Sequence, residues 1–384
     1  MKILFLVYHG FSDSSGISKK IHSQVKALRQ NGHEVSLCSY DFSPEGHRCR
    51  YIDGRVLADY GTGRMAALRQ RTDYKPIFDH CVATATELVY ARCFQNASPW
   101  LVAFFRRLRR AGIRAVMEVP TYPYDQEFAG YNWDQRLSLA IDKMFRRQLA
   151  RQLDAIVTFS DETEIFGQRT IRISNGVDLD SLPLHRATGH ATPAINMIGV
   201  AELHYWHGFD RMIAGMGRYY QQGGRRDLRF HIVGDVHPAY MTQGTPFSPP
   251  FRDMIDMYGL ADRVVFHGQL FGDRLDRVFD DCQFAVGSLG RHRSGISVIK
   301  TLKNREYASR GLPFIYSEQD SDFDSQPYIL KAPADESPID MEKIIDFIDH
   351  FHTPPADIRR TVEHLAWRQQ MQRVVTDISQ HEPV

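Results

Sequence analysis

Basic residues surround one predicted helix start in this sequence. A loop that includes Gly295 leads into a helix that we expect to open near Thr301, and Lys300 and Lys303 flank that point. The first N–H groups of a helix, here those of about Thr301 and Leu302, have no partner within the helix and therefore attract anions. The lysines add positive charge nearby. The segment thus predicts a phosphate-binding site.

One acid lies among these bases. Glu306 follows Arg305 within the same predicted helix. Its carboxylate can form an ion pair with a lysine or an arginine one helical turn away, or it can face a bound ligand. The residues alone leave both roles open.

Further polar segments follow predicted strands. Residues 14–16, Ser-Ser-Gly, precede the first helix, and Gly16 lets a backbone or an anion approach closely there. Glu118, Thr121 and Tyr122 follow a later strand and offer a carboxylate, a hydroxyl and an aromatic ring. Such groups can hold a sugar by hydrogen bonds and stacking.

Asn175 lies in an Asn-Gly turn at the end of the first half of the chain, and His207 lies in an aromatic loop early in the second half. Each of these segments also fits a plainer explanation, such as a helix cap, a turn or an aromatic loop packed beneath a helix. Because ligands of open α/β sheets bind at the carboxyl ends of strands, five unusual segments at strand ends predict a binding site.

The elements around these segments form a repeating pattern. Residues 3–8 are a continuous apolar run, typical of a strand buried on both faces. An amphipathic helix follows, and residues 33–38 form the next strand, which makes a βαβ unit and hence a parallel sheet. We expect further strands at 88–91, 115–119 and 155–159, and in a second block at 194–200, 228–233, 264–267, 284–286 and 313–316.

The two blocks predict an α/β protein with two Rossmann-like, doubly wound parallel-sheet domains that face a central cleft. The expected domains are residues 1–185 and 186–356, since the polar stretch 178–193 separates the blocks. Residues 357–384 then form a last helix that packs back on the first domain. A chain of 384 residues is long enough for two such cores.

The composition of the chain argues against several classes of partner and structural site. A net charge of +1 gives no reason to expect a nucleic-acid partner. The five cysteines are odd in number and lack CxxC spacing, which indicates reduced thiols rather than disulfides or a zinc site. The apolar start of the chain is too short for a signal peptide, and no window approaches the roughly 20 apolar residues of a membrane span. We therefore expect a cytoplasmic protein.

The order of segments resembles glycosyltransferase family 4, a large retaining family with the GT-B fold. SSGISKKIHSQVKALRQNGHEV is similar to the opening loop and helix of that family, SNGVDLD to its pre-linker NGVD, and NREYASRGLPFI to its EAMACGxPVI segment. WHGFDRMI occupies the place of its KG segment. WHGFDR and LKNREY together resemble a subgroup found in bacterial capsule and exopolysaccharide gene clusters.

The resemblance implies roles and also shows departures. Glu306 fits the second glutamate of an E-x7-E pair, which implies a hydrogen bond to the nucleotide ribose, but Val298 stands at the first, where an acid contacts the donor sugar. His207 stands where a lysine neutralises the diphosphate, and a neutral or half-charged histidine is a weaker partner. Lys300, Lys303 or Arg211 can compensate.

The function that follows is transfer of a sugar from a nucleotide-diphosphate sugar to a saccharide or lipid-linked acceptor, with retention and without a metal. Alternatives are a GT-B sugar-nucleotide epimerase and a degenerate, non-catalytic GT-B partner protein. The expected catalytic residues are Glu118, on the acceptor side, with Lys303 and Glu306. Thr121 and Tyr122 are expected to bind the acceptor. The expected donor-binding residues are Gly16, Asn175, His207, Gly268, Gly295, Lys300, Thr301, Leu302 and Glu306.

Two predicted helices, at residues 100–110 and 143–151, combine aromatic residues with arginines. Basic amphipathic helices can lie on anionic lipid, which would place the protein at the inner membrane face. Alternatively, each helix packs its apolar stripe in the domain and exposes its arginines to water.

Overall fold

The computed structural model describes residues 1–12, 16–92, 96–125, 133–186 and 194–382. They form two compact units. The first comprises Met1–Gly176 and Trp367–Val384, and the second Val177–Ala366. The first domain thus ends earlier than the expected 185, and the second continues to Ala366 rather than 356. Each unit is an α/β domain, as predicted.

The first domain is built on a nine-stranded sheet in the order β4-β3-β2-β1-β5-β6-β7-β9-β8. Neighbours from β2 to β9 are parallel, for example Ile3 of β1 opposite Val35 of β2, as the βαβ pattern predicts. The edge strands β4 and β8, and β3 next to β4, pair in antiparallel fashion and were not predicted. The strands are β1 (Lys2–Leu6), β2 (Glu34–Phe42), β3 (Arg48–Ile52), β4 (Arg55–Asp59), β5 (Leu88–Arg92), β6 (Arg114–Val119), β7 (Ala155–Thr158), β8 (Glu164–Ile165) and β9 (Gln168–Arg172).

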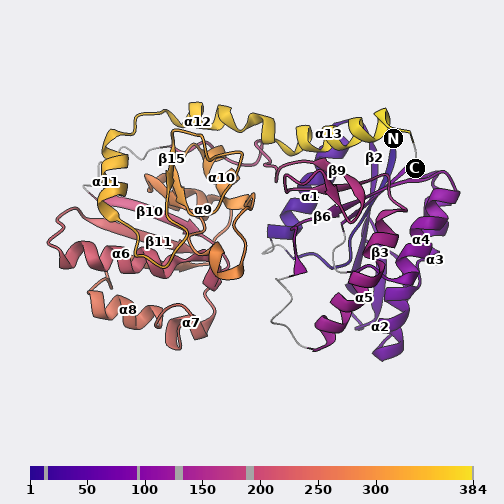
Figure 1. Ribbon diagram of the computed structural model, residues 1–384, viewed down its shortest axis with the longest axis horizontal. Coiled ribbons are helices and arrows are strands. Elements are labelled where there is room, and N and C mark those ends of the chain that lie inside the picture. The colour runs from indigo at the N-terminus through magenta and orange to yellow at the C-terminus, as the bar shows by residue number, and fades with distance from the viewer. Residues whose placement is uncertain (13–15, 93–95, 126–132, 187–193, 383–384) are drawn as a thin grey trace. The chain divides into compact units, whose positions relative to one another are not determined.

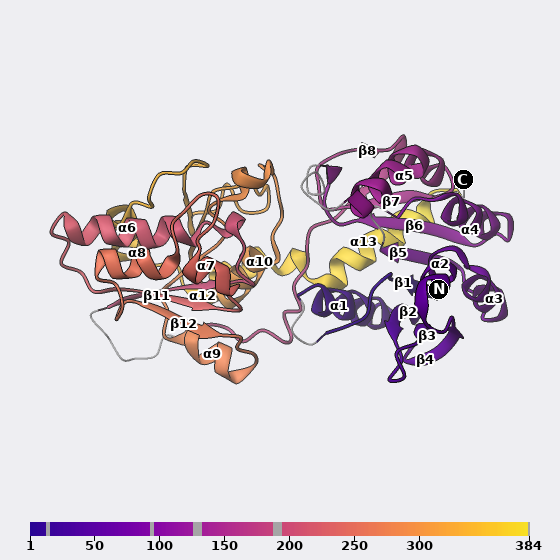
Figure 2. The ribbon, with the colours of Figure 1, turned by 90° about the horizontal axis from the view of Figure 1, so that it is seen from below.

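Helices cover both faces of this sheet (Figures 1 and 2). The core on one face joins strand side chains to apolar residues of α3, α4 and α5. On the other face α1 packs beside α13, the last helix of the chain, as Figure 2 shows. The helices are α1 (Gly16–Gln30), α2 (Gly63–Thr72), α3 (Lys75–Ala83), α4 (Pro99–Arg110), α5 (Trp133–Ala150) and α13 (Trp367–Gln380).

The second domain has a six-stranded sheet in the order β12-β11-β10-β13-β14-β15, and all its neighbours are parallel. The strands are β10 (Ile195–Val200), β11 (Leu228–Val233), β12 (Val264–Gly268), β13 (Phe284–Val286), β14 (Phe314–Tyr316) and β15 (Ile329–Lys331). The helices are α6 (Phe209–Gln221), α7 (Pro238–Thr242), α8 (Phe251–Tyr258), α9 (Asp273–Asp280), α10 (Leu302–Arg310), α11 (Met341–His350) and α12 (Pro355–Thr361), with single 3-10 turns η2 (Tyr205–His207), η3 (Arg291–Ser294) and η4 (Glu363–Leu365).

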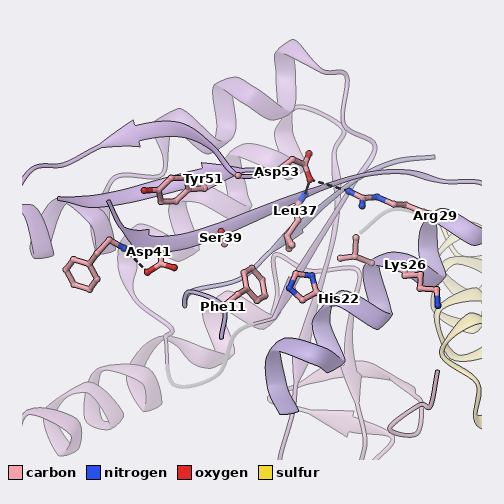
Figure 3. Close-up of a pocket in the computed structure, with 12 residues that line it drawn as sticks. Phe11, His22, Lys26, Arg29, Leu37, Ser39, Asp41, Tyr51 and Asp53 are labelled. Atoms are coloured by element: carbon pink, nitrogen blue, oxygen red, sulfur yellow. Dashed lines mark hydrogen bonds and ion pairs between the residues drawn. The ribbon is translucent and has the colours of Figure 1, made fainter. Parts of the chain in front are cut away.

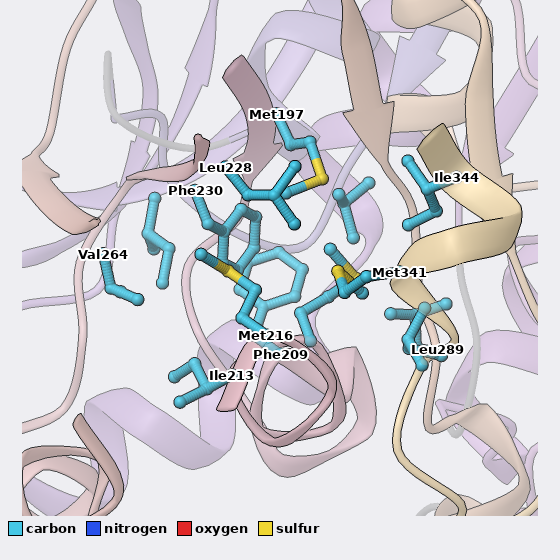
Figure 4. Close-up of a cluster of buried hydrophobic side chains, with 14 of the residues drawn as sticks. Met197, Phe209, Ile213, Met216, Leu228, Phe230, Val264, Leu289, Met341 and Ile344 are labelled. Carbon is cyan, nitrogen blue, oxygen red and sulfur yellow. The ribbon is translucent and has the colours of Figure 1, made fainter. Parts of the chain in front are cut away.

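Alternation along the strands shows that this sheet is covered on both faces. Met197 of β10 packs in the core formed with α6, α8 and α11 (Figure 4), whereas its neighbour Ile198 packs in the core formed with α9, α10 and α12. Successive side chains of a strand point to opposite faces, so both faces must be apolar. The sequence of β10 is apolar for this reason.

The expected last helix is two helices. α12 ends at Thr361 in the second domain, and α13 begins at Trp367 in the first. The chain passes from one domain to the other twice, after Gly176 and after Ala366. The two passing segments run side by side, since the Val177 N–H donates to the Leu365 carbonyl at 3.1 Å. The break occurs because one helix cannot belong to two separate cores. In the first domain, α13 packs against α1.

Candidate functional site

In the second domain, three loops meet at the carboxyl edge of the sheet. The Leu289 N–H, after β13, donates to the His207 carbonyl, after β10, at 2.9 Å. The Ser317 N–H, after β14, donates to the Ser288 carbonyl at 3.0 Å. Gly208 adopts φ +66°, and a Cβ there would lie 2.7 Å from the Leu289 carbonyl carbon. Only glycine permits this close approach of two loops.

His207 is buried in this edge and neutral. Its Nδ1 accepts a hydrogen bond from the His204 N–H at 3.0 Å, so the ring proton lies on Nε2. Burial lowers the pKa of His207 well below its usual value, and Lys303 and Arg291 lower it further. His207 therefore cannot provide the positive charge that a lysine at this position would provide.

The start of α10 lies where the sequence predicted it. Thr301 is the N-cap residue, and its side chain makes no capping hydrogen bond. The Thr301 and Lys300 side chains are buried, and Leu302, the first helical residue, is half-buried. The N–H groups of this first turn have no partner within the helix and carry the positive end of its dipole. The turn can therefore hold an anion.

Lys303 provides the cation that His207 does not. Its ammonium nitrogen is buried and has no hydrogen-bond partner among the residues that the structure describes. Burial and the nearby Arg291 lower the pKa of Lys303 to about 7, although Glu318 opposes this shift. A buried ammonium group without a partner is costly in an apolar core. The same group is well suited to bind an anionic ligand.

Two other charged residues of α10 have partners. The Glu306 carboxylate accepts a hydrogen bond from Arg310 Nε at 3.0 Å, which is the ion pair that the sequence left open as an alternative to ribose binding. Arg305 is fully buried and binds Asp320 through both terminal nitrogens, with Nη2 at 2.9 Å from Oδ1. Arg305 thus fixes α10 to the loop after β14.

The two glycines expected at the donor site stand at backbone turns. Gly268 ends β12 with φ +66°, and its carbonyl accepts from the Gly234 N–H at 2.8 Å. Gly295 ends η3 with φ +70°. Both conformations favour glycine for backbone reasons. Neither observation tests a ligand contact.

Glu118 has an environment different from the expected one. It is fully buried in the first domain. Oε2 accepts from the Tyr90 hydroxyl at 2.6 Å and from Gln24 at 2.7 Å, while Oε1 lies 3.1 Å from Arg92 Nε and 3.2 Å from Lys20 Nζ. Burial raises the pKa of this carboxyl, but the two cations outweigh it and hold it below its usual value. This carboxylate has no surface for an acceptor and holds a buried ion cluster together.

The remaining predicted residues of the first domain lie at several places. Thr121 and Tyr122 are half-buried in the loop after β6, and the Tyr122 ring contacts Phe166 edge-on at 5.7 Å. Gly16 is exposed and begins α1, whereas residues 14 and 15 lie outside the described residues. Asn175 is half-buried in the segment that meets α13, where a Cβ on Gly176 would lie 2.4 Å from Trp367.

The two basic helices differ. α4 buries its apolar stripe in the core of the first domain and leaves its arginines at the surface, which agrees with the plainer alternative. α5 instead exposes Leu137, Ile141 and Met144, at 50%, 38% and 68%. These three residues are spaced so that they share one helix face. Lys143 and Arg147 are exposed beside them.

The first domain also contains a hollow that the sequence did not indicate. A cavity of about 680 Å³ lies between α1 and the β2–β3 hairpin. Figure 3 shows His22, Lys26 and Arg29 of α1 on one side and Tyr51 and Asp53 on the other. Aromatic and charged side chains thus share one surface, but nothing in the sequence pattern joins α1 to this hairpin.

Among the described residues, no three His, Cys, Asp or Glu side chains gather as a metal site. No described helix is long and apolar enough to cross a membrane.

Comparisons with known proteins now bear on this geometry. Residues 15–164 match the model of the glycosyl transferase 4-like domain. No curated protein matches the chain. Among solved structures, sucrose-phosphate synthase from Thermosynechococcus elongatus superposes with a TM-score of 0.64 at 14% identity, over 99% of both chains. WaaG, a glycosyltransferase involved in lipopolysaccharide biosynthesis, gives 0.62 at 11% identity over 99% of this chain and 100% of that chain.

HepE of Anabaena, solved in complex with UDP-glucose, gives a TM-score of 0.60 at 14% identity, over 99% of this chain and 100% of that chain. These likenesses show the GT-B fold, and the match of residues 15–164 to the glycosyl transferase 4-like domain indicates the glycosyltransferase class. Its first domain contains a glycosyl transferase 4-like domain. The predicted fold and enzyme class are therefore confirmed.

Sequence reasoning missed several residues that the structure brings to these sites. Glu318 and Arg291 lie near Lys303, and Lys20 and Arg92 hold Glu118. All four are ordinary charged residues in the sequence, and no motif marks them. They could have been singled out only as charges at predicted strand ends or on the buried face of α1.

Proposed function

We propose that this protein transfers a sugar from a nucleotide-diphosphate sugar to a saccharide acceptor, with retention and without a metal, in the synthesis of a surface polysaccharide or glycoconjugate. The observation that carries the proposal is the start of α10, where the first N–H groups lack a partner within the helix and Lys303 of the first turn has a buried ammonium nitrogen without a hydrogen-bond partner among the described residues. The structurally similar HepE and trehalose-6-phosphate synthase were solved with UDP-glucose and UDP-2-fluoro-glucose, which supports a donor of this class.

The chemistry requires stabilisation of the leaving diphosphate as negative charge develops on it. Preorganised N–H groups at Thr301 and Leu302, with the Lys303 ammonium, serve this purpose. The acceptor hydroxyl attacks the anomeric carbon on the face that the diphosphate leaves, so the configuration is retained. The resemblance to family 4 supports this stereochemistry.

Calorimetric titration with UDP-, GDP- and dTDP-sugars tests the proposal. We expect one donor to bind tightly, and the anomeric configuration of the product, read by NMR once an acceptor is found, to match that of the donor. Turnover of the donor without any acceptor would instead favour a sugar-nucleotide epimerase. If no nucleotide binds, the alternative that remains is a non-catalytic partner protein.

We further propose that the acceptor is presented at a membrane surface, on the cytoplasmic face, and that α5 contacts the lipid. The exposed stripe of Leu137, Ile141 and Met144 next to Lys143 and Arg147 supports this. Apolar residues flanked by cations suit an anionic bilayer. Flotation with vesicles containing phosphatidylglycerol should recover the wild-type protein and lose the double variant L137D/M144D.

The control for flotation is R106Q/R109Q in α4, which removes two positive charges from a helix whose apolar face is already buried. We expect this variant to float nearly as well as the wild type. Equal loss in both double variants would show that general charge, rather than the α5 stripe, drives binding. No flotation of the wild type would overturn the membrane proposal and leave the transferase proposal standing.

A further inference from the structure

Two groups that can carry opposite charges are buried in the second domain, and neither has a hydrogen-bond partner among the described residues. They are the Lys303 ammonium nitrogen and the Glu318 carboxylate, of which both oxygens are buried. Glu318 is 2% exposed. Burying an ionised group without a partner is strongly unfavourable. Such an arrangement indicates a functional pair rather than one that stabilises the fold.

The backbone holds Glu318 in place relative to α10. Gln319, the next residue, accepts a hydrogen bond from the Ile299 N–H at 3.0 Å and donates to the Ser297 carbonyl at 2.7 Å. The segment before α10 therefore runs alongside the loop after β14. Lys331 Nζ also donates to the Glu318 carbonyl. The loop that carries Glu318 is thus joined by main-chain hydrogen bonds to the segment that leads into α10.

The other charges nearby do not replace Glu318. Arg291 of η3 lowers the pKa of Lys303, and Glu318 raises it. In the same loop as Glu318, Asp320 is bound to Arg305. On the β10 side, burial lowers the pKa of both His204 and His207, so both favour the neutral form. Glu318 is therefore the acid that counteracts the lowering of the Lys303 pKa by burial and by Arg291.

We propose that Glu318 is a positioning residue that keeps the Lys303 side chain positively charged, so that it can bind the diphosphate of the donor. This inference rests on the proposed function. Glu318 need not touch the ligand, since it acts through Lys303. Burial first, then the neighbouring Asp320, raise the pKa of Glu318, while Arg291 and Lys303 lower it.

The variant Glu318→Gln tests this role by calorimetric titration of UDP, GDP and dTDP between pH 6 and 9. In the wild type, affinity for the nucleoside diphosphate that binds should weaken as pH rises above about 7, since Lys303 then loses its proton. Without Glu318 the pKa of Lys303 falls. If the pKa falls by about one unit, we expect about fivefold weaker binding at pH 7 and only about twofold weaker binding at pH 6, so that the whole profile moves to lower pH by about one unit.

Two further variants separate this role from a structural one. Adding Lys303→Arg to Glu318→Gln should remove the pH dependence and restore binding at pH 7, because arginine stays charged. Glu342→Gln, an exposed acid at the start of α11, should leave the wild-type profile unchanged. A uniform loss of affinity at every pH in Glu318→Gln, or an unchanged profile, would overturn the inference.

If Glu318→Gln does not fold, the wild type still decides the question. An anion beside Lys303 raises its pKa, so nucleotide binding near pH 8 should take up protons, measured as a dependence of binding heat on the ionisation enthalpy of the buffer. Uptake that sets in near pH 6 rather than near pH 7 would show that Glu318 does not raise the pKa of Lys303, which would overturn the inference but not the proposed function. If the wild type binds no nucleoside diphosphate, the proposed function fails first, and the inference fails with it.

Discussion

The substitution Glu118→Gln separates a structural carboxylate from a catalytic one. Glu118 is fully buried, and Lys20 and Arg92 lie within 3.2 Å and 3.1 Å of it. Glutamine keeps the shape but removes the charge, which leaves two buried cations without their partner. Breaking a buried ion pair in this way costs about 3–5 kcal/mol. We expect a loss of this size in the free energy of unfolding of the first domain.

The assay follows urea unfolding by tryptophan fluorescence in a Trp206→Phe background. Trp206 is the tryptophan of the second domain, whereas Trp100, Trp133 and Trp367 belong to the first. The remaining signal therefore reports on the domain that contains Glu118. The reading is restricted to one domain because two domains can unfold in separate steps.

Glu34→Gln is the matched control. Its carboxylate is 75% exposed and lies 4.0 Å from Lys2 Nζ, so the change should cost less than about 1 kcal/mol. If Glu118→Gln unfolds like this control but loses transferase turnover at 20 °C, the carboxylate is catalytic and the structural reasoning is refuted. If it is destabilised and the folded fraction keeps its turnover, the structural role stands.

Three further substitutions test other contacts. Gly176→Ala should destabilise the first domain by about 1–3 kcal/mol through overpacking, because its Cβ would meet the Trp367 ring, and urea unfolding would measure this loss. Arg305→Lys keeps the charge but loses the paired hydrogen bonds to Asp320, at about 1.5–3 kcal/mol for each bond lost, measured in the second domain through Trp206. His207→Lys places a third cation beside two others and should not strengthen nucleotide binding; calorimetry that showed tighter binding would contradict the arrangement described here.

The sequence by itself determined the layout of the chain. Continuous apolar runs such as residues 3–8 require strands covered on both faces, and the helices between them require parallel sheets, so two doubly wound domains follow from local patterns alone. The helix start at Thr301 was equally readable, because the point where a helix begins, and the N–H groups that lack a partner within it, depend on neighbours in sequence.

The sequence could not determine which side chains meet across the fold. Glu118 lies near the end of β6, where the sequence made it look available to a ligand, but its partners lie on α1 and β5, far away in the chain. Strands β3 and β4 were missed because a half-exposed hairpin has no continuous apolar run. The domain crossing near Ala366 was missed because helix propensity carries no information about which core a helix joins.

At the phosphate side of the proposed donor site, too, the sequence determined some features and the tertiary structure determined others. Spacing along the chain indicated that cations gather near Thr301, and that His207 stands where a lysine was expected. Only tertiary structure decided that His207 is neutral, that Lys303 is buried without a hydrogen-bond partner among the described residues, and that Glu318 lies near it. The physical reason is that charge state depends on burial and on neighbours brought together by folding, which no local pattern encodes.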